Sequence, residues 1–350
     1  MSARRVTLSD VAARVGLSKA AVSQVLNSHP ASRVSVDAAA RIRAAAGELG
    51  YRPNLTARSL TTRRSGVIGL VSEAITTDRF GSGMIRGALA EAKRQGYVLF
   101  ITETEDQQAG IVSSFGVLVD HQVDGLIYAS IRPHAVELPE VNADIPVVML
   151  NAVASRPTAT VLADEHAGGE SIVRLLLDAG HTEDVVIIGR DRSVRPAWTT
   201  RAIERRLAGI SAALAAHDVV PISEIDMPEW DPDHGYEAMR GLLASGRRPG
   251  AVIALNDRLA FGVYRALTEA GLRVSEDVSV VSFDDDDIAL YLEPTLTTAA
   301  LPYEEMGALA VRILLDPDLT VGEQLVPMPI RVRGSVSAVP QELKSFDRPH

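Results

Sequence analysis

Residues 6–27 read Val-Thr-Leu-Ser-Asp-Val-Ala-Ala-Arg-Val-Gly-Leu-Ser-Lys-Ala-Ala-Val-Ser-Gln-Val-Leu-Asn. After Thr7, apolar residues at positions 8, 11, 12 and 15 repeat with the period of one helix face. Thr7 followed by Asp10 predicts an N-terminal cap. Gly16 predicts the end of the helix, because glycine readily adopts the left-handed conformation found there. We therefore predict a first helix over residues 8–15.

A second helix is expected after a three-residue turn. Ser18 predicts its cap, positions 22, 25 and 26 form its inward face, and Asn27 marks its end. A third helix is expected from Ser35 to Gly50, with apolar residues at 42, 45, 46 and 49 inward. Two short helices joined by a glycine-containing turn make a helix-turn-helix.

Charge is divided unevenly along the 350 residues, whose formal net charge is −10. Residues 1–64 hold eleven Lys and Arg residues against three acidic ones, whereas the rest of the chain holds 24 basic and 42 acidic residues. A basic head on an acidic body is typical of nucleic-acid-binding proteins. A solvated basic tail is the alternative, and the apolar periodicity of the head argues against it.

The quoted stretch resembles the N-terminal headpiece of the lactose-repressor (LacI/GalR) family. Tyr51-Arg-Pro-Asn54 followed by Ala57-Arg-Ser-Leu60 resembles that family's hinge. The resemblance implies a DNA-binding headpiece over 1–52 and a hinge helix over 53–64. It also implies that the second helix enters the major groove and that Leu60 wedges into the minor groove. The residues implied to contact DNA are Thr7, Ser18, Lys19, Ala20, Ser23, Gln24, Asn27, Asn54, Ala57, Arg58 and Leu60.

Gln24 departs from the family pattern, which usually has Arg at this position and Thr at the position of Ala21. Arg favours guanine, whereas Gln suits adenine. Contact of Gln24 with phosphate or solvent alone is the alternative interpretation. Ser18, Ser23 and Asn27 are expected to bind phosphates, which sets the register on DNA without reading its sequence.

From Gly66 onward, short β-branched runs alternate with helical stretches. Runs typical of strands lie at 67–71, 97–102, 125–128, 147–150, 185–188, 251–255 and 278–283. Helical stretches lie at 83–95, 168–179, 202–216, 260–270 and 304–315. Strand runs without polar alternation, separated by helices, predict parallel sheets covered on both faces. The number of elements favours two doubly wound sheets.

The body also resembles the family's periplasmic-binding-protein-like core, an α/β fold of two subdomains. Landmarks are Val161-Leu-Ala-Asp164, Gly168-Gly169, Val280–Asp285 and Leu296-Thr-Thr298. The resemblance implies a core over 65–338, with one subdomain of about 65–163 with 297–325 and the other of 164–296 with 326–338. A flexible tail over 339–350 follows. The effector contacts that it implies are Glu73, Phe80, Asn151, Arg206, Trp230, Asn256, Asp284 and Tyr303.

Several of these polar residues follow predicted strands, where ligands of parallel α/β sheets bind. A guanidinium with carboxylates, amides and aromatic faces suits a hydroxylated ring. Alternatives remain open at individual positions. Asp257 could cap a helix, Phe80 and Tyr303 could be core residues, and Arg201 could replace Arg206 as the contact.

Other features argue against catalysis. The chain has no cysteine, which excludes disulfides, CxxC zinc sites and thiol chemistry. No HExxH, GxSxG or Walker A motif occurs. Asp284–Asp287 and Asp164-Glu-His166 could hold a metal, but loop, turn and helix-capping roles are predicted for them, with His166 exposed. We expect no metal, cofactor, membrane span or export signal, and a cytoplasmic location.

We therefore expect a sequence-specific transcriptional regulator, a repressor of genes for carbohydrate or other small-metabolite use. Its expected partners are a near-palindromic double-stranded DNA operator and a sugar or nucleoside-like effector. A homodimer is predicted, because the polar tail lacks the apolar heptads of a tetramerising helix. The competing hypothesis is an α/β ligand-binding or metabolic protein with an unrelated basic N-terminus. Whether the effector induces or co-represses is left open.

Overall fold

The computed structural model describes residues 6–26, 34–51, 64–73, 75–76, 81–104, 108–131, 134–140, 145–190, 201–227 and 229–339. The chain forms two compact units, Met1–Gly66 and Val67–His350. The predicted hinge over 53–64 lies outside the described residues except for Arg64, and so does the predicted tail beyond Val339. In the described part of the chain, no helix combines the length and apolarity that crossing a membrane requires.

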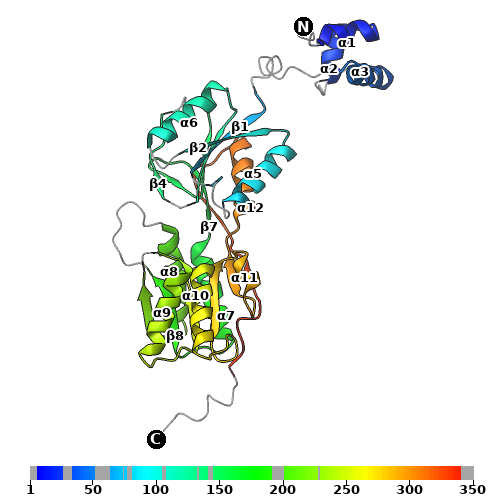
Figure 1. Cartoon of the computed structure of the whole chain (residues 1–350). Helices are drawn as coiled ribbons and strands as arrows, with labels where there is room; N and C mark the ends of the chain where they lie inside the picture. The colour runs from blue at the N-terminus through cyan, green and yellow to red at the C-terminus, as the bar shows by residue number, and fades with distance from the viewer. Residues whose placement is uncertain are drawn as a thin grey trace. The chain divides into compact units, whose positions relative to one another are not determined.

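The first unit contains the three predicted helices, α1 (Leu8–Val15), α2 (Lys19–Leu26) and α3 (Val36–Glu48) (Figure 1). The Asp10 carboxylate accepts hydrogen bonds from the backbone N–H of Thr7 at 2.8 Å and from its hydroxyl at 2.7 Å. Gly16 ends α1 with φ of 70°. The inward faces meet in one small core, which contains residues 11, 12, 15, 22, 25, 42, 45 and 46.

The first sheet of the second unit is wholly parallel. Its strand order is β13 (Gly322–Val326), β7 (Ala159–Ala163), β5 (Val147–Leu150), β3 (Leu126–Ser130), β1 (Val67–Glu73) and β2 (Val98–Thr104). Helices α5 (Ser82–Arg94) and α12 (Tyr303–Leu315) share one core with this sheet. Helix α6 (Gln108–Asp120) packs with it in a separate core, formed by its other face. A small ribbon of β4 (Ala135–Val136) and β6 (Val153–Ala154) completes this subdomain.

The second sheet is parallel except at one edge, where β14 pairs antiparallel with β12. Its order is β14 (Ile330–Arg331), β12 (Thr297–Ala300), β11 (Ser279–Asp284), β10 (Ala251–Ala254), β8 (Val185–Arg190) and β9 (Ser223–Asp226). Helices α7 (Glu165–Asp178) and α8 (Arg201–Ala215) pack in one core with it. Helices α9 (Pro232–Ala244) and α10 (Asp257–Glu269) pack in another, and α11 (Ile288–Tyr291) is a single turn. The prediction of two α/β sheets is confirmed.

The chain passes between the two sheets three times, after β7, after β12 and after β13. The boundary predicted at 296/297 is wrong by four residues. Thr297–Ala300 pairs in register with Val281–Asp284 and so belongs to the second sheet. The boundary predicted at 325/326 is one residue early, because Val326 still pairs with Ala163 in the first sheet.

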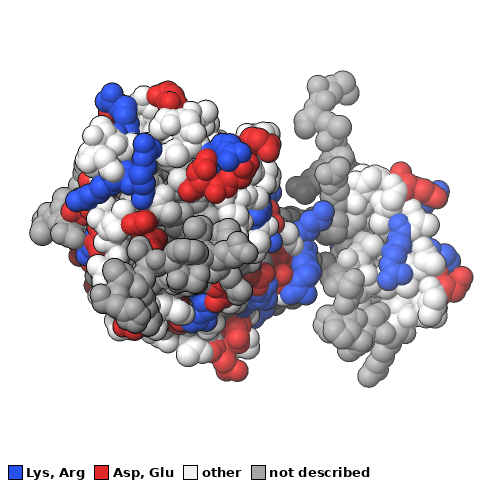
Figure 2. Space-filling view, turned by 90° about the horizontal axis from the view of Figure 1, so that it is seen from below, with Lys and Arg blue, Asp and Glu red and all other residues white. Residues whose placement is uncertain are grey.

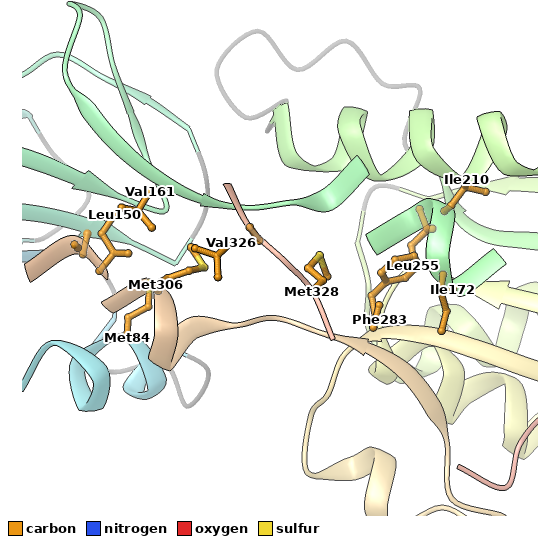
Figure 3. Close-up of a cluster of buried hydrophobic side chains, with 14 of the residues drawn as sticks. Met84, Leu150, Val161, Ile172, Ile210, Leu255, Phe283, Met306, Val326 and Met328 are labelled. Carbon is orange, nitrogen blue, oxygen red and sulfur yellow. The ribbon is translucent and has the colours of Figure 1, made fainter. Parts of the chain in front are cut away.

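One continuous apolar cluster links the two subdomains across these crossovers. Met84, Leu150, Val161 and Met306 lie on the side of the first sheet, and Ile172, Ile210, Leu255 and Phe283 lie on the side of the second (Figure 3). Val326, at the end of β13, and Met328, on the crossover that follows, lie between the two groups (Figure 3). The crossover segments therefore contribute to the packing at the junction as well as connecting the sheets.

Three helix pairs approach each other through glycines. A Cβ at Gly87 or Gly307 would overlap backbone of the partner helix in the α5–α12 pair. The same holds at Gly235 and Gly262 in the α9–α10 pair, and at Gly169 and Gly209 in the α7–α8 pair. These glycines therefore set how closely the two helices of each pair approach each other.

Candidate functional site

The second helix of the first unit presents a polar face. Lys19, Ala20 and Gln24 are all exposed on α2. The Ser18 hydroxyl accepts a hydrogen bond from the backbone N–H of Ala21 at 3.2 Å, so it caps the helix as predicted. The exposed face at the start of α2 is the part of a helix-turn-helix that meets base edges.

The other predicted DNA contacts divide into two groups. Thr7 is exposed and Ser23 half-buried, and both belong to described helix termini or faces. Asn27, Asn54, Ala57, Arg58 and Leu60 lie outside the described residues.

At the carboxyl end of β1, Glu73 is buried with two polar partners. The Tyr128 hydroxyl donates to Glu73 Oε2 at 2.5 Å, and His134 Nε2 lies 3.2 Å from the same oxygen. Tyr128 and His134 were not among the predicted site residues. Tyr128 sits inside a strand run that predicts only core, and His134 lies beyond the end of that run, so neither carries a separate signal in the sequence.

Asn151 follows β5 and is buried. Its backbone has φ of 53°, in the left-handed region where Asn is among the more tolerated residues. Its side-chain amide donates to the carbonyl oxygens of Ser130 at 2.9 Å and Ile131 at 3.2 Å. Asn151 therefore ties the ends of β3 and β5 together at the edge where Glu73 lies.

Arg206 lies buried on α8 and makes charged contacts with α7 and with the end of β11. Its Nε and Nη2 donate to the two carboxylate oxygens of Glu165 at 2.7 and 3.0 Å. Its Nη1 donates to the carbonyl oxygen of Leu255 at 2.6 Å and lies 3.6 Å from Asp284 Oδ1. The guanidinium also stacks on Phe283, 4.4 Å from the ring centre.

Burial and the neighbouring charges shift the pKa values of Arg206 and Asp284. Burial alone would lower the pKa of Arg206. The negative charges of Glu165 and Asp284 outweigh this effect and raise the pKa above its ordinary value, so the guanidinium stays protonated. Burial raises the pKa of Asp284 to about 6, with Glu165 adding to the effect and Arg206 opposing it. Asp284 also has φ of 104°, a strained value for a residue with a side chain.

Asn256 and Asp257 have structural partners. Asn256 caps α10, since its Oδ1 accepts from the backbone N–H of Leu259 at 2.8 Å. Asp257 is wholly buried, and its carboxylate accepts from the Asp286 backbone N–H at 2.7 Å and the Thr298 hydroxyl at 2.8 Å. Burial raises the pKa of Asp257 well above its usual value. The interpretation of Asp257 as the cap of α10 is wrong, because its neighbour Asn256 does this.

The two acidic loop motifs differ in whether a side chain caps the helix that follows. Asp164 caps α7 by accepting from the Ala167 N–H at 3.1 Å, and His166 is exposed. Asp286 Oδ1 accepts from the Ile288 N–H at 3.0 Å, beside the N-cap residue of α11, Asp287, whose own side chain makes no capping hydrogen bond. The sequence did not reveal that Glu165, between Asp164 and His166, points inward to Arg206. Acidic residues are common in the first turn of exposed helices, so the pattern alone suggests no more than that.

Two cavities flank the Arg206 cluster. The first, of about 290 Å³, is lined by His134, Ala135, Asn151, Val153, Ala154, Ser155, Leu162, Ala163, Glu165, Ala202 and Arg205. The second, of about 430 Å³, is lined by Gly83, Arg86, Asp284–Asp287, Ala300–Glu305, Pro329 and Arg331. Glu165 lines the first cavity and Asp284 the second, so Arg206 contacts a wall residue of each.

The remaining predicted effector residues are placed differently. Tyr303 is half-buried at the start of α12 and lines the second cavity. Trp230 is half-buried and packs on both cores of the second sheet, and its carbonyl oxygen accepts from Asn256 at 3.3 Å. Phe80 lies outside the described residues, as does the side chain of Arg201.

In the described part of the chain, one group of side chains could hold a metal ion. Glu229, Asp231 and His234 have ligand atoms within 4.8 Å of one another, and the two carboxylates are exposed. The group lies at the N-terminus of α9, whose dipole disfavours cations. Asp231 also lies 3.6 Å from Arg258. These features speak against a cation there, and the absence of metals and cofactors stays a prediction.

The surface carries charges of both signs. Figure 2 shows acidic and basic side chains scattered over the face in view. Exposed ion pairs of the described residues include Arg86–Glu304 and Arg240–Glu237.

Comparison with known proteins identifies the family. Residues 7–54 match the lacI family of bacterial regulatory proteins, and residues 173–336 match the periplasmic binding protein-like domain. The ribose operon repressor of Escherichia coli K12 is 32% identical over 313 residues, which cover 88% of this chain and 92% of that protein. This chain belongs to the lacI family of bacterial regulatory proteins.

Further relatives and solved structures support the assignment of this regulator to the lacI family. The HTH-type transcriptional repressor PurR of Pectobacterium atrosepticum is 30% identical over 315 residues, 89% of each chain. A crystal structure of the lac repressor dimer bound to operator and the anti-inducer ONPF superposes with a TM-score of 0.73 at 27% identity, covering 96% of this chain and all of that one. The cellobiose complex of the regulator CelR gives a TM-score of 0.60 at 26% identity, covering 95% of this chain and all of that one.

These matches settle the class of protein. The lacI-family regulator is a DNA-binding repressor with a helix-turn-helix and an effector-binding core, and it is not an enzyme. The competing hypothesis of a metabolic α/β protein with an unrelated basic N-terminus is wrong, because residues 7–54 themselves match the family.

Proposed function

We propose that this regulator binds a near-palindromic operator as a homodimer and that a sugar or nucleoside-like effector binds beside Arg206. Palindromic half-sites match the two-fold symmetry of a dimer. The observation that carries the proposal is the buried Arg206 cluster between two cavities. It gathers charged donors and acceptors where strands of both sheets end.

On DNA, Lys19, Ala20 and Gln24 would read bases, because Lys19 and Ala20 are exposed at the start of α2 and Gln24 is exposed about one turn further along. Ser18, Ser23 and Asn27 would contact phosphates and set the register, and Thr7 would be a further DNA contact. The hinge residues Asn54, Ala57, Arg58 and Leu60 would complete the contact in the minor groove, with Leu60 as the wedge.

In the core, Glu73, Asn151, Arg206, Asp284 and Tyr303 would surround the effector. Phe80, Trp230 and Asn256 would complete its contacts. Carboxylate, amide and guanidinium groups can bracket neighbouring hydroxyls. An effector of this kind controls DNA binding only to the extent that it binds the two states of the protein with different affinity.

An exposed apolar edge supports the homodimer. β2 is an edge strand of the first sheet, and its Val98, Phe100 and Ile101 are exposed. Val112 and Val117 on the adjoining α6 are exposed as well. Apolar edges of this kind are typical of interfaces between subunits.

Fluorescence anisotropy with a panel of labelled palindromic operators tests the proposal, with and without sugars and nucleosides. We expect tight, salt-sensitive binding to one palindrome. One compound should then release the protein from it, or strengthen binding if the compound is a co-repressor. Equal affinity for every sequence, or no response to any compound of these classes, would contradict the proposal.

A further inference from the structure

We propose that Glu165 makes this regulator selective for neutral polyhydroxylated effectors, by occupying the face of Arg206 that would otherwise bind a carboxylate or phosphate. The inference rests on the proposed function and deepens it, because it names the charge class of the effector and the residue that sets it.

The first step is the geometry of the guanidinium. Arg binds carboxylates and phosphates best through two parallel N–H donors, which form a planar fork. In Arg206 the fork of Nε and Nη2 is filled by both oxygens of Glu165, at 2.7 and 3.0 Å. Its Nη1 already donates to the Leu255 carbonyl. One N–H of Nη1 and one of Nη2 remain after these three hydrogen bonds, and Asp284 Oδ1 already lies 3.6 Å from Nη1. Two carboxylates therefore already balance the charge of the guanidinium, which favours hydrogen bonds to neutral hydroxyls over a further anion.

The second step concerns the other cations near the first cavity. Among its described lining residues, those able to carry positive charge are His134 and Arg205. Arg205 is held by Glu323 at 2.6 Å, and His134 by Glu73 at 3.2 Å. Both side chains are therefore already paired with a carboxylate, so neither offers an incoming anion a positive charge that is not already balanced.

The third step concerns the second cavity, which lies on the Asp284 side of Arg206 and is lined by more acidic than basic side chains. Asp284 is a second carboxylate beside Arg206, at 3.6 Å. The described lining of the second cavity includes six acidic side chains and two basic ones. The acidic side chains would repel an anionic effector. To bind Arg206 through the fork, the effector would also have to displace Glu165, and the buried Glu165 carboxylate would then lack its partner. A neutral sugar can instead donate its hydroxyls to these carboxylates.

The test uses matched ligand pairs on the full-length protein: glucose and glucuronate, galactose and galacturonate, adenosine and adenosine monophosphate. Isothermal titration calorimetry should find at least one neutral member that binds, with its acidic partner at least 100-fold weaker. An acidic member that binds as tightly as its neutral partner would overturn the proposal.

The variant Glu165→Gln tests the role of the residue itself. It should gain binding of at least one acidic probe by at least tenfold over the wild type, because one arm of the Arg206 fork is freed and the opposing charge is gone. Glu165→Asp keeps the charge and should continue to exclude the acidic probes. The matched control is Glu170→Gln on the same helix, which removes the partner of Arg174 at the surface and should change no affinity.

The two proposals fail in different ways. If no neutral probe binds but Glu165→Gln still gains an acidic one, the effector class of the proposed function is wrong and the role of Glu165 stands. If a neutral probe binds the wild type and a folded Glu165→Gln gains no acidic probe, the role of Glu165 is wrong and the proposed function stands. If Glu165→Gln does not fold, the wild-type pairs decide.

Discussion

A Cβ placed on Gly169 of α7 would lie 2.5 Å from the carbonyl oxygen of Arg206 on α8. The two helices can approach this closely only because position 169 has no side chain. Glu165 lies one helical turn before Gly169 on the same face of α7. The approach that needs the glycine therefore also brings the Glu165 carboxylate onto the Arg206 guanidinium. The close approach at Gly169 therefore determines both how α7 packs on α8 and which carboxylate lies against Arg206.

Gly169→Ala should destabilise the protein by about 1–3 kcal/mol, because the added methyl group meets backbone that cannot move aside cheaply. Urea unfolding followed by circular dichroism measures this. Gly241→Ala on α9 is the control, since its Cβ would meet nothing within 4 Å, and it should stabilise by roughly 0.5–1 kcal/mol. Equal stability of Gly169→Ala and the wild type would show that α7 and α8 can separate without loss.

Asp284 predicts a pH dependence. Its folded-state pKa of about 6 lies above the ordinary value of 3.8, so the folded state binds more protons than the unfolded state between about pH 4 and 6. The contribution of Asp284 to the free energy of unfolding is therefore present at low pH and is lost as the pH rises through 6. The variant Asp284→Asn has no carboxyl group here and does not lose stability in this way.

The stability of Asp284→Asn relative to the wild type should therefore rise by about 2–3 kcal/mol between pH 4 and pH 7. The charge of Asp284 also raises the pKa of Asp257, so the variant lowers the pKa of Asp257 as well, and this change acts in the same direction. Thermal unfolding at several pH values measures the difference. A difference that is constant with pH would mean that Asp284 titrates normally.

Gln24→Arg should change the sequence that the headpiece prefers. If Gln24 contacts a base, the variant should move the preference at one position of each half-site from A·T toward G·C, by about 1–3 kcal/mol. A competition assay with operators that differ at single positions measures this. Contact with phosphate alone would instead raise affinity for all sequences equally and steepen the dependence on salt.

Phe100→Glu should weaken the proposed dimer, because a charge on the apolar β2 edge would be buried without a partner. Sedimentation velocity should then find monomer at concentrations where the wild type is dimeric. Val220→Glu, at an exposed apolar position after α8 and away from β2, is the control and should leave the dimer intact. An unchanged sedimentation coefficient for Phe100→Glu would place the interface elsewhere.

Much of the fold can be predicted from the sequence, and the reasons are local. The cap at Thr7 and the stop at Gly16 lie within nine residues of each other, and the predicted bounds of α1 are confirmed to the residue. The central strands are continuous apolar runs and stand out in the same way. The strand β9 is half-exposed at a sheet edge and has no such run, which is why it was not predicted.

The candidate site could be predicted only in part. Arg206 and Asp284 follow from the family resemblance and from strand ends. The partner of Arg206 could not be predicted, because Glu165 precedes it by 41 residues and meets it only through the packing of α7 on α8. The error at Thr297 has a similar cause. Whether a strand continues one sheet or begins a return to the other depends on pairing with β11, and pairing leaves no mark on the strand's own residues.

The last two strands have a consequence for how the protein is made. β13 completes one edge of the first sheet and β14 completes one edge of the second, and both lie within residues 322–331. During synthesis the chain emerges from the ribosome N-terminus first. Neither half of the core can then add the last strand of its sheet until nearly the whole polypeptide has been translated. Both halves are completed together, so a nascent chain cut short before Gly322 would expose β7 and β12, which β13 and β14 cover in the finished protein, to chaperones or proteases.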